Sequence, residues 1–174
     1  MILRTPIALI SAVLILSGCA SSDSQVEVVP NPAASTGPVL TGTPVSVEVT
    51  GEIAAEPVVV ITPGDPVTEL GVTDLIVGAG DKVPEGATVT AHYVGYGAAT
   101  GVMFDASWAR GEPATFPLDQ VILGWQEGLV GMQVGGRRLL VIPGALGYGE
   151  NPPPGSGIEP GETLIFVVDL VSFQ

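Results

Sequence analysis

The chain has 174 residues, of which 5 are Lys or Arg and 18 are Asp or Glu, and its formal net charge is −13. A surface this acidic repels phosphate, which argues against nucleic-acid binding. One cysteine and one histidine can neither form an internal disulfide nor complete a zinc site of three or four nitrogen and sulfur ligands. We therefore expect no nucleic-acid partner, no metal and no cofactor, and the 24 glycines and 16 prolines favour a β-rich chain with many turns.

The first 18 residues are typical of a secretion signal. Arg4 precedes an apolar run over residues 6–16, which is too short to cross a bilayer because a spanning helix needs roughly 20 residues. The run ends in LSGC, which resembles the lipobox of bacterial lipoproteins and places Cys19 at the lipidated position. The resemblance implies an extracytoplasmic protein, lipid-anchored to the cell membrane of a bacterium. The alternative is an ordinary secretory signal with an incidental cysteine.

The next segments connect this signal to a folded domain. Residues 19–43 are small and polar, so we expect a flexible tether. In residues 44–66, valines alternate with polar residues and a second apolar run follows. This pattern fits strands added to the next domain or an extended linker, and we favour the strands slightly.

Residues 67–174 are predicted to form one domain, with its core over about 86–174. Alternating or short apolar runs predict strands over 72–77, 87–94, 102–104, 137–142 and 163–173. Between 121 and 132, apolar residues recur at spacings of three and four, which indicates one buried face of a helix. The fold class that follows is α+β, with a twisted antiparallel sheet wrapped around one short helix.

The sequence of this domain shows no motif for hydrolysis, phosphoryl transfer or covalent catalysis. His92 lies on the polar face of its strand, the Gly78–Gly80 segment leads into a strand rather than a helix, and the only lysine, Lys82, lies in a turn. These features are typical of a structural histidine and of turns. What does stand out is a set of aromatic residues next to sharp turns.

Six motifs carry a resemblance over about residues 68–174. They are TVTAHYVG at 88–95, FDAS at 104–107, VILGWQEGL at 121–129, MQVGGRRLLVI at 132–142, GYG at 147–149 and GETLIFVVDLV at 161–171. Together they resemble the FKBP-type peptidyl-prolyl cis-trans isomerases. The resemblance implies an isomerase that acts on X–Pro bonds of exported proteins, with proline-containing polypeptides as partners and macrolides as further ligands. We expect a monomer whose membrane contact is the lipid anchor.

The resemblance also implies the residues of the pocket. These are Tyr93, Phe104, Asp105, Arg110, Val121, Ile122, Trp125, Tyr148, Ile158 and Phe166. Trp125 would be the floor under the proline ring, and the Tyr148 hydroxyl and the Ile122 N–H would bind substrate carbonyls. Phe116 we assign to the core.

The chain departs from the family pattern at the rim of this pocket. Ala114 replaces an aromatic residue, Gln120 an acid and Gly157 an apolar residue, and the 150–157 loop is rich in proline. These changes bear on substrate preference and macrolide affinity. They keep open the alternative of a binding module with little turnover; a holding chaperone is less favoured, because no apolar insertion could serve as a client surface.

Overall fold

The structure is a computed structural model that describes residues 43–174. The signal-like segment, Cys19 and all but the last residue of the 19–43 segment lie outside the described residues.

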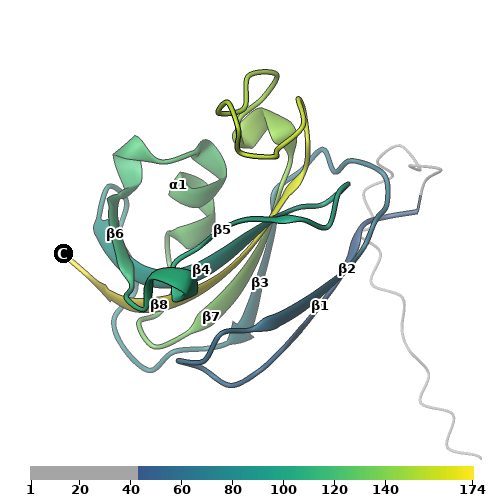
Figure 1. The fold of residues 1–174 in the computed structure, drawn as a ribbon. Helices are drawn as coiled ribbons and strands as arrows, with labels where there is room; N and C mark the ends of the chain where they lie inside the picture. Colours follow the sequence, from purple (N-terminus) through teal and green to yellow (C-terminus); the bar gives the residue numbers. More distant parts are fainter. Residues whose placement is uncertain (1–42) are drawn as a thin grey trace, which may run out of the picture. The chain divides into compact units, whose positions relative to one another are not determined.

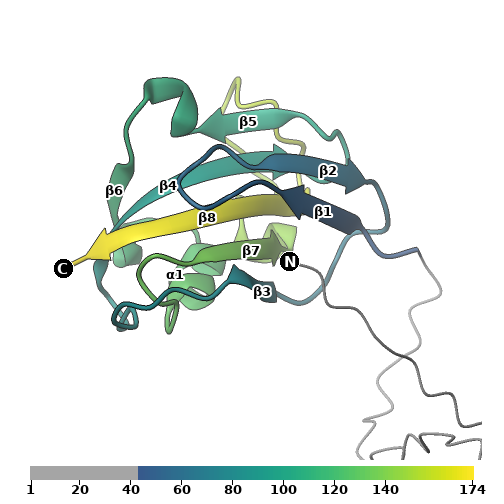
Figure 2. The ribbon, with the colours of Figure 1, turned by 90° about the horizontal axis from the view of Figure 1, so that it is seen from below.

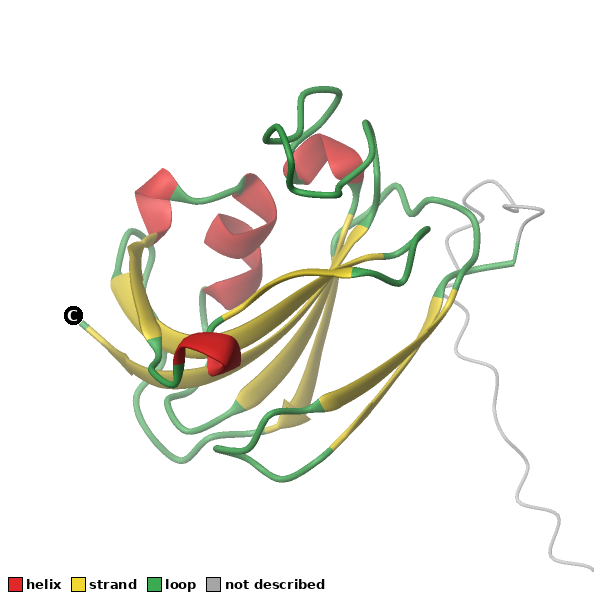
Figure 3. Cartoon of the chain, in the orientation of Figure 1, coloured by secondary structure: helices red, strands yellow, loops and turns green. Residues whose placement is uncertain are grey.

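The described part of the chain contains eight strands and one α-helix (Figures 1 and 3). In chain order they are β1 (Ser46–Thr50), β2 (Val58–Thr62), β3 (Gly71–Ile76), β4 (Thr88–Gly97), β5 (Met103–Ala106), β6 (Ala114–Pro117), α1 (Leu123–Leu129), β7 (Arg137–Ile142) and β8 (Leu164–Phe173). Three short 3-10 helices lie in the connections, η1 (Trp108–Arg110), η2 (Leu118–Gln120) and η3 (Gly144–Leu146). The predicted fold class is confirmed: an antiparallel sheet wraps around one short helix.

The main sheet is built around its two longest strands. Its order is β3-β7-β8-β4-β5, and β6 also pairs with β4. One edge of β4 is shared between two partners, because Thr88–Ala91 pair with β6 while Val94–Tyr96 pair with β5. The chain between β5 and β6 bulges away from β4 and contains η1. Tyr93 lies in β4 beside this gap.

The helix is shorter than the predicted 121–132 segment. Val121 and Ile122 have an extended backbone and precede α1. Their side chains match the apolar spacing of the helix, but the two residues are not helical. Two glycines inside the helix let it approach β7 closely. A Cβ on Gly124 would lie 2.4 Å from Ile142 Cγ2, and one on Gly128 would lie 2.7 Å from Leu140 Cδ2. The close approach explains why the helix tolerates two residues that weaken it.

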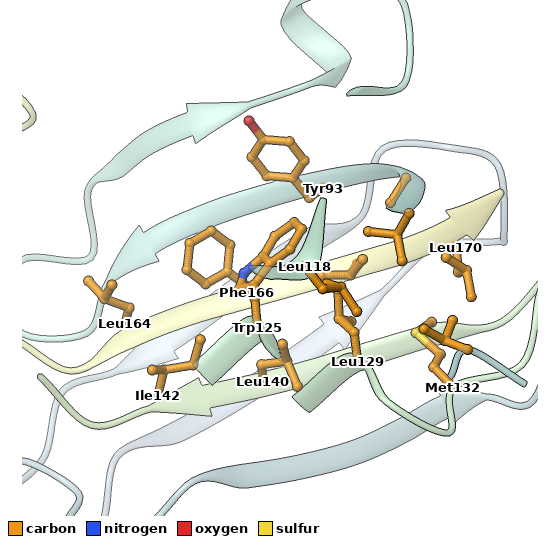
Figure 4. Packing of buried hydrophobic residues seen from close by; sticks show 14 of the residues in the cluster. Tyr93, Leu118, Trp125, Leu129, Met132, Leu140, Ile142, Leu164, Phe166 and Leu170 are labelled. Atoms are coloured by element: carbon orange, nitrogen blue, oxygen red, sulfur yellow. The ribbon is translucent and has the colours of Figure 1, made fainter. Parts of the chain in front are cut away.

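The main core lies between α1 and the sheet (Figure 4). Leu129 and Met132 from the helix segment pack with Leu140 and Ile142 of β7 and with Leu164 of β8. Each of these side chains is essentially inaccessible to water. Burying a side chain of this size contributes roughly 1.5–3 kcal/mol, so this layer fixes the helix on the sheet.

Residues 44–66 contain strands and not only an extended linker. The strands β1 and β2 pair with each other in a separate two-stranded sheet. The hairpin covers the face of the main sheet opposite α1, which gives three layers (Figure 2). The valines and isoleucine of its inner face pack on a second buried cluster: Val94, Ala98, Ala106, Leu139, Ile165 and Val167. The hairpin is therefore part of the folded body and not an edge extension of the main sheet.

A buried ion pair fixes the turn of this hairpin. Arg137 is 1% exposed and bonds Asp169 through Nε at 2.5 Å and Nη2 at 2.7 Å. The same guanidinium donates to the carbonyl oxygens of Gly51, at 3.0 Å, and Ala55, at 2.7 Å, while the Ala54 N–H donates to Asp169. Every group of the pair thus has a partner, which a buried charge requires.

Candidate active site

A cavity of about 260 Å³ opens between α1, the strands β4 and β5 and the loop before β8. The residues that line it are Tyr93, Phe104, Asp105, Phe116, Gln120, Val121, Ile122, Trp125, Tyr148 and Phe166. They come from five segments of the chain: β4, β5, the stretch from β6 to α1, the loop before β8, and β8 itself. The lining is mostly aromatic and aliphatic, as in sites that bury an apolar ligand group.

Trp125 is the centre of the aromatic lining. Its ring meets those of Tyr93, Phe116 and Phe166 edge to face, with centroids 5.4, 5.6 and 5.4 Å apart. Phe104 meets Phe166 in the same way at 5.5 Å. Edge-to-face contacts hold aromatic rings in defined orientations. Rings locked in this way form a rigid wall that does not collapse into the cavity.

The indole nitrogen of Trp125 is a polar exception. It is the one buried side-chain polar atom without a hydrogen-bond partner among residues 43–174. An unmatched buried donor costs free energy and is typical of functional positions. The Trp125 side chain, which forms the floor of the cavity, is therefore held by packing contacts and not by a hydrogen bond to the rest of the protein.

One wall carries a polar group of three residues. The Tyr93 hydroxyl donates to Asp105 Oδ2, and Arg110 donates to both partners, from Nη2 to the Tyr93 hydroxyl at 2.8 Å and from Nη1 to Asp105 Oδ1 at 2.8 Å. Asp105 and Arg110 are partly exposed, so their ion pair alone contributes little to stability. Its effect is to orient the tyrosine.

The pKa values follow from these contacts. Burial, and then the hydrogen bond to Asp105, raises the pKa of Tyr93 to about 12. Burial works against ionisation of Asp105, but the hydrogen bonds from Tyr93 and Arg110 outweigh it, and its pKa falls below the usual value. Burial and the Asp105 charge raise the pKa of Tyr148. Both tyrosines therefore keep their protons at neutral pH, and Asp105 is ionised.

A second set of contacts places Arg110. Ser107 is fully buried and accepts a hydrogen bond from the Tyr93 N–H at 2.8 Å, and its hydroxyl also lies 3.0 Å from His92 Nδ1. Trp108 stacks on His92 with ring centroids 3.9 Å apart. These contacts attach η1 to β4. His92 thus has a structural role here, as the sequence indicated.

Two further donors belong to residues that line the cavity. The Tyr148 hydroxyl is half-buried in the lining, and the Ile122 N–H has no acceptor within the described residues. Gln126 Nε2 donates to the Val121 carbonyl at 2.8 Å and fixes the extended segment before α1. Donors at the edge of an apolar cavity can bind the carbonyl groups that flank an enclosed ring.

Most predicted site residues meet at this cavity, but two lie elsewhere. Arg110 does not line it and acts through Tyr93 and Asp105. Ile158 is buried in the main core beside the cavity. Phe116, which we assigned to the core, also lines the cavity, as does Gln120. Nothing in the sequence pattern distinguishes Gln120, and β6 has too few residues for a periodic pattern to locate Phe116.

Two kinds of feature are absent from residues 43–174. No group of three or more His, Cys, Asp or Glu side chains there is arranged to hold a metal ion. No helix of residues 43–174 has the length and apolar character needed to cross a membrane.

Comparisons with known proteins agree with this geometry. Residues 80–171 match the family model described as FKBP-type peptidyl-prolyl cis-trans isomerase. An FK506-binding protein of Streptomyces anulatus is 51% identical over 111 residues, which cover 63% of this chain and 90% of that protein. A probable FK506-binding protein of Corynebacterium glutamicum is 50% identical over 105 residues, 60% of this chain and 86% of that protein.

Solved structures give the same result. FkpA from Escherichia coli superposes with a TM-score of 0.56 and 40% identity, over 60% of this chain and 48% of that chain. A peptidyl-prolyl cis-trans isomerase from Pseudomonas syringae superposes with a TM-score of 0.55 and 33% identity, over 60% of this chain and 75% of that chain.

Proposed function

The chain belongs to the FKBP-type peptidyl-prolyl cis-trans isomerases, and on that premise we propose that the cavity around Trp125 is where it accelerates X–Pro isomerisation in exported proteins. The observation that carries the proposal is the rigid aromatic cavity with donors on its rim. A proline ring fits on the Trp125 floor between Phe104, Val121, Ile122 and Phe166. The Tyr148 hydroxyl and the Ile122 N–H bind the flanking carbonyls.

The chemistry needs neither proton transfer nor a covalent intermediate. Rotation about the peptide bond costs ~18–20 kcal/mol, because amide resonance is lost in the twisted state. The twisted amide is less charge-separated than the planar one, so a water-poor apolar cavity favours it over the ground state. Each tenfold acceleration requires only about 1.4 kcal/mol of this difference. The scarcity of ionisable groups in the cavity is consistent with such catalysis.

The test is isomerisation of a short X–Pro peptide by the purified full chain. We expect faster cis-to-trans conversion than in buffer, and Trp125→Ala removes most of the acceleration because the floor is lost. Background rates from the wild-type protein would refute the proposal. Tight capture of proline peptides without turnover would instead support a binding module, the alternative that Ala114 and Gly157 favour through a thinner rim.

We further propose that the protein is a lipoprotein held outside the cytoplasm by lipid on Cys19. The support is the LSGC motif after a short apolar run. An acidic protein is not attracted to anionic lipid, so the acyl chains would supply the anchoring. Expression in a bacterium fed a labelled fatty acid should label the wild type and not Cys19→Ala. Equal labelling of the two forms would exclude Cys19 as the site.

The remaining partners follow from the same premise. Proline-containing polypeptides are the substrates, and a macrolide of the FK506 type would compete for the same cavity. The changes at Ala114, Gln120 and Gly157 weaken its expected affinity. Inhibition of the peptide assay measures this affinity, and sedimentation of the detergent-free protein without its lipid tests the expected monomer.

A further inference from the structure

Glu162 is a buried carboxylate without a cationic partner. Its residue is 7% exposed and lies just before β8. The ion pairs among residues 43–174 join other side chains, Arg110 with Asp105, Arg137 with Asp169 and Arg138 with Asp74. A buried charge of this kind persists only if hydrogen-bond donors surround it.

Four donors meet the two oxygens of this carboxylate. Oε1 accepts from the N–H groups of Ala99, at 3.1 Å, and Thr100, at 3.3 Å, and from the Thr100 hydroxyl at 3.4 Å. Oε2 accepts from the Glu159 N–H at 2.9 Å. One oxygen thus binds the turn between β4 and β5, while the other binds the loop that leads into β8.

The two joined segments carry different parts of the cavity lining. The turn over residues 97–102 leads directly into β5, with Phe104 and Asp105. The loop begins at Tyr148, and its far end returns to the start because the Gly161 N–H donates to the Gly149 carbonyl at 2.8 Å. Glu162 lies between the two segments and is not one of the residues that line the cavity.

Gly97 provides the space for this carboxylate. A Cβ there would lie 2.3 Å from Glu162 Oε1 and 2.7 Å from Thr100 Oγ1. Its backbone does not adopt a positive φ, so glycine is needed for room and not for conformation. The position of Glu162 therefore requires a residue without a side chain at 97, in the segment that its Oε1 binds.

We propose that Glu162 is a positioning residue that sets the separation of the Phe104–Asp105 wall from the Tyr148 wall. The proposal rests on the proposed function, since it explains how that cavity keeps its catalytic geometry. Proline binding depends mainly on the Trp125 floor, which Glu162 does not contact. The Tyr148 contact depends on wall placement, and a misplacement of about 1 Å can cost up to a hundredfold in rate.

The experiment compares kcat and KM of the full-length wild type with Glu162→Ala, Glu162→Gln and Gly97→Ala. We expect Glu162→Ala and Gly97→Ala to lower kcat about tenfold or more, with KM within about threefold. Glu162→Gln keeps an acceptor for only one of the two segments, so its kcat should lie between that of the wild type and that of Glu162→Ala. The matched control is Glu159→Gln, which removes the same charge from an exposed side chain three residues away and should leave both constants unchanged.

The double variant Glu162→Ala/Gly97→Ala tests whether Glu162 and Gly97 act through the same contact. If both residues serve one contact, its loss in kcat is close to that of either single variant. Wild-type kcat in the folded Glu162→Gln and Glu162→Ala proteins, with only a lower melting temperature, would overturn the proposal. So would a KM effect without a kcat effect.

A second readout does not depend on catalysis. Nuclear magnetic resonance of the same variants should show shifts of the ring signals of both Phe104 and Tyr148, with Val47 of the hairpin unchanged. If the wild type proves inactive, the proposed function fails, and the ring signals still decide the role of Glu162. Shifts confined to one wall, or absent from both, would refute it.

Discussion

Gly95 lies directly behind the ring of Phe104: a Cβ on this glycine would be 2.8 Å from Phe104 Cζ. It would be equally close to Phe166 Cε1, 2.8 Å away. Strand β4 thus lacks a side chain at the place where the edge-to-face pair of Phe104 and Phe166 needs room. A side chain at this position would have to displace both rings, which line the cavity.

Gly95→Ala should therefore impair the site more than the fold. The added methyl group pushes Phe104 and Phe166 toward the cavity, and overpacking of this kind costs about 1–3 kcal/mol. We expect kcat/KM for an X–Pro peptide to fall by about tenfold or more, because the rings then occupy space meant for proline. Gly71→Ala adds the same group to edge strand β3, away from the cavity, and should leave kcat/KM unchanged. Equal losses in the two variants would contradict this account.

The pH dependence of the reaction should be flat over a wide range. The raised pKa of Tyr93, about 12, and that of Tyr148 keep both hydroxyls protonated through neutral pH and above. The lowered pKa of Asp105 keeps its carboxylate ionised well into the acid range. Exchange spectroscopy of a proline peptide should give a constant kcat/KM between about pH 5 and 9.

Asp105 sets the acid limit of this plateau. Because its pKa is lower in the folded state than in the unfolded chain, its contribution to stability is complete above the unfolded value and disappears as the pH falls through the folded value. Asp105→Asn should remove this acid limb and weaken the orientation of Tyr93. A steep loss of activity near pH 6.5 in the wild type would point to another group.

The Arg137–Asp169 pair should matter for stability and not for catalysis. Asp169→Asn leaves a buried guanidinium without its counter-charge, and breaking such a pair costs about 3–5 kcal/mol. Urea unfolding measures this loss. In the control Asp74→Asn, the removed carboxylate is 40% exposed, and Arg138 keeps the Gly128 carbonyl as an acceptor, so we expect about 1 kcal/mol.

Both variants should retain kcat at temperatures well below unfolding. The pair lies under the hairpin, on the face of the sheet opposite α1. A tenfold loss of kcat in folded Asp169→Asn would show that the hairpin layer is coupled to the cavity.

The charge distribution predicts a preference among peptides. Three of the four Lys and Arg side chains in residues 43–174 are held in ion pairs, which leaves Lys82. The segments next to the cavity lining carry exposed carboxylates at Glu112, Asp119 and Glu150. A peptide with Lys before proline should therefore have a higher kcat/KM than one with Glu, by about tenfold at low ionic strength.

Salt should reduce this difference, because the Debye length falls to about 3 Å at 1 M. Glu150→Gln should reduce it too, while Glu48→Gln, with the same charge change on the hairpin, should not. A preference that survives high salt would indicate a direct contact in the cavity instead of the general field.

The sequence predicted the central strands well, because their apolar residues alternate with the period of a half-buried sheet. It placed the start of the helix too early, since Val121 and Ile122 continue an apolar spacing while the backbone is still extended. It did not indicate β6, whose four residues are too few to display a period. It favoured strands over an extended linker for residues 44–66 only slightly, because the contacts that hold the hairpin turn come from Arg137, far along the chain.

The site shows a similar division. Aromatic residues within distinctive motifs, such as Trp125 and Tyr148, could be named from the sequence. The places of Gln120 in the lining and of Ile158 in the core depend on tertiary packing, which no local sequence pattern records. Glu162 belongs to the same group, because its four donors come from segments more than sixty residues apart and from its own turn.

The docked hairpin has a mechanical consequence. A pull on the chain before Thr43 enters the fold through β1, whose five residues pair with β2. It must then break the contacts of Arg137 with the hairpin turn before it reaches β7 and β8. The cavity lies beyond that point, on the other side of the main sheet. We therefore expect a force applied at Thr43 to separate the hairpin layer before it distorts the cavity.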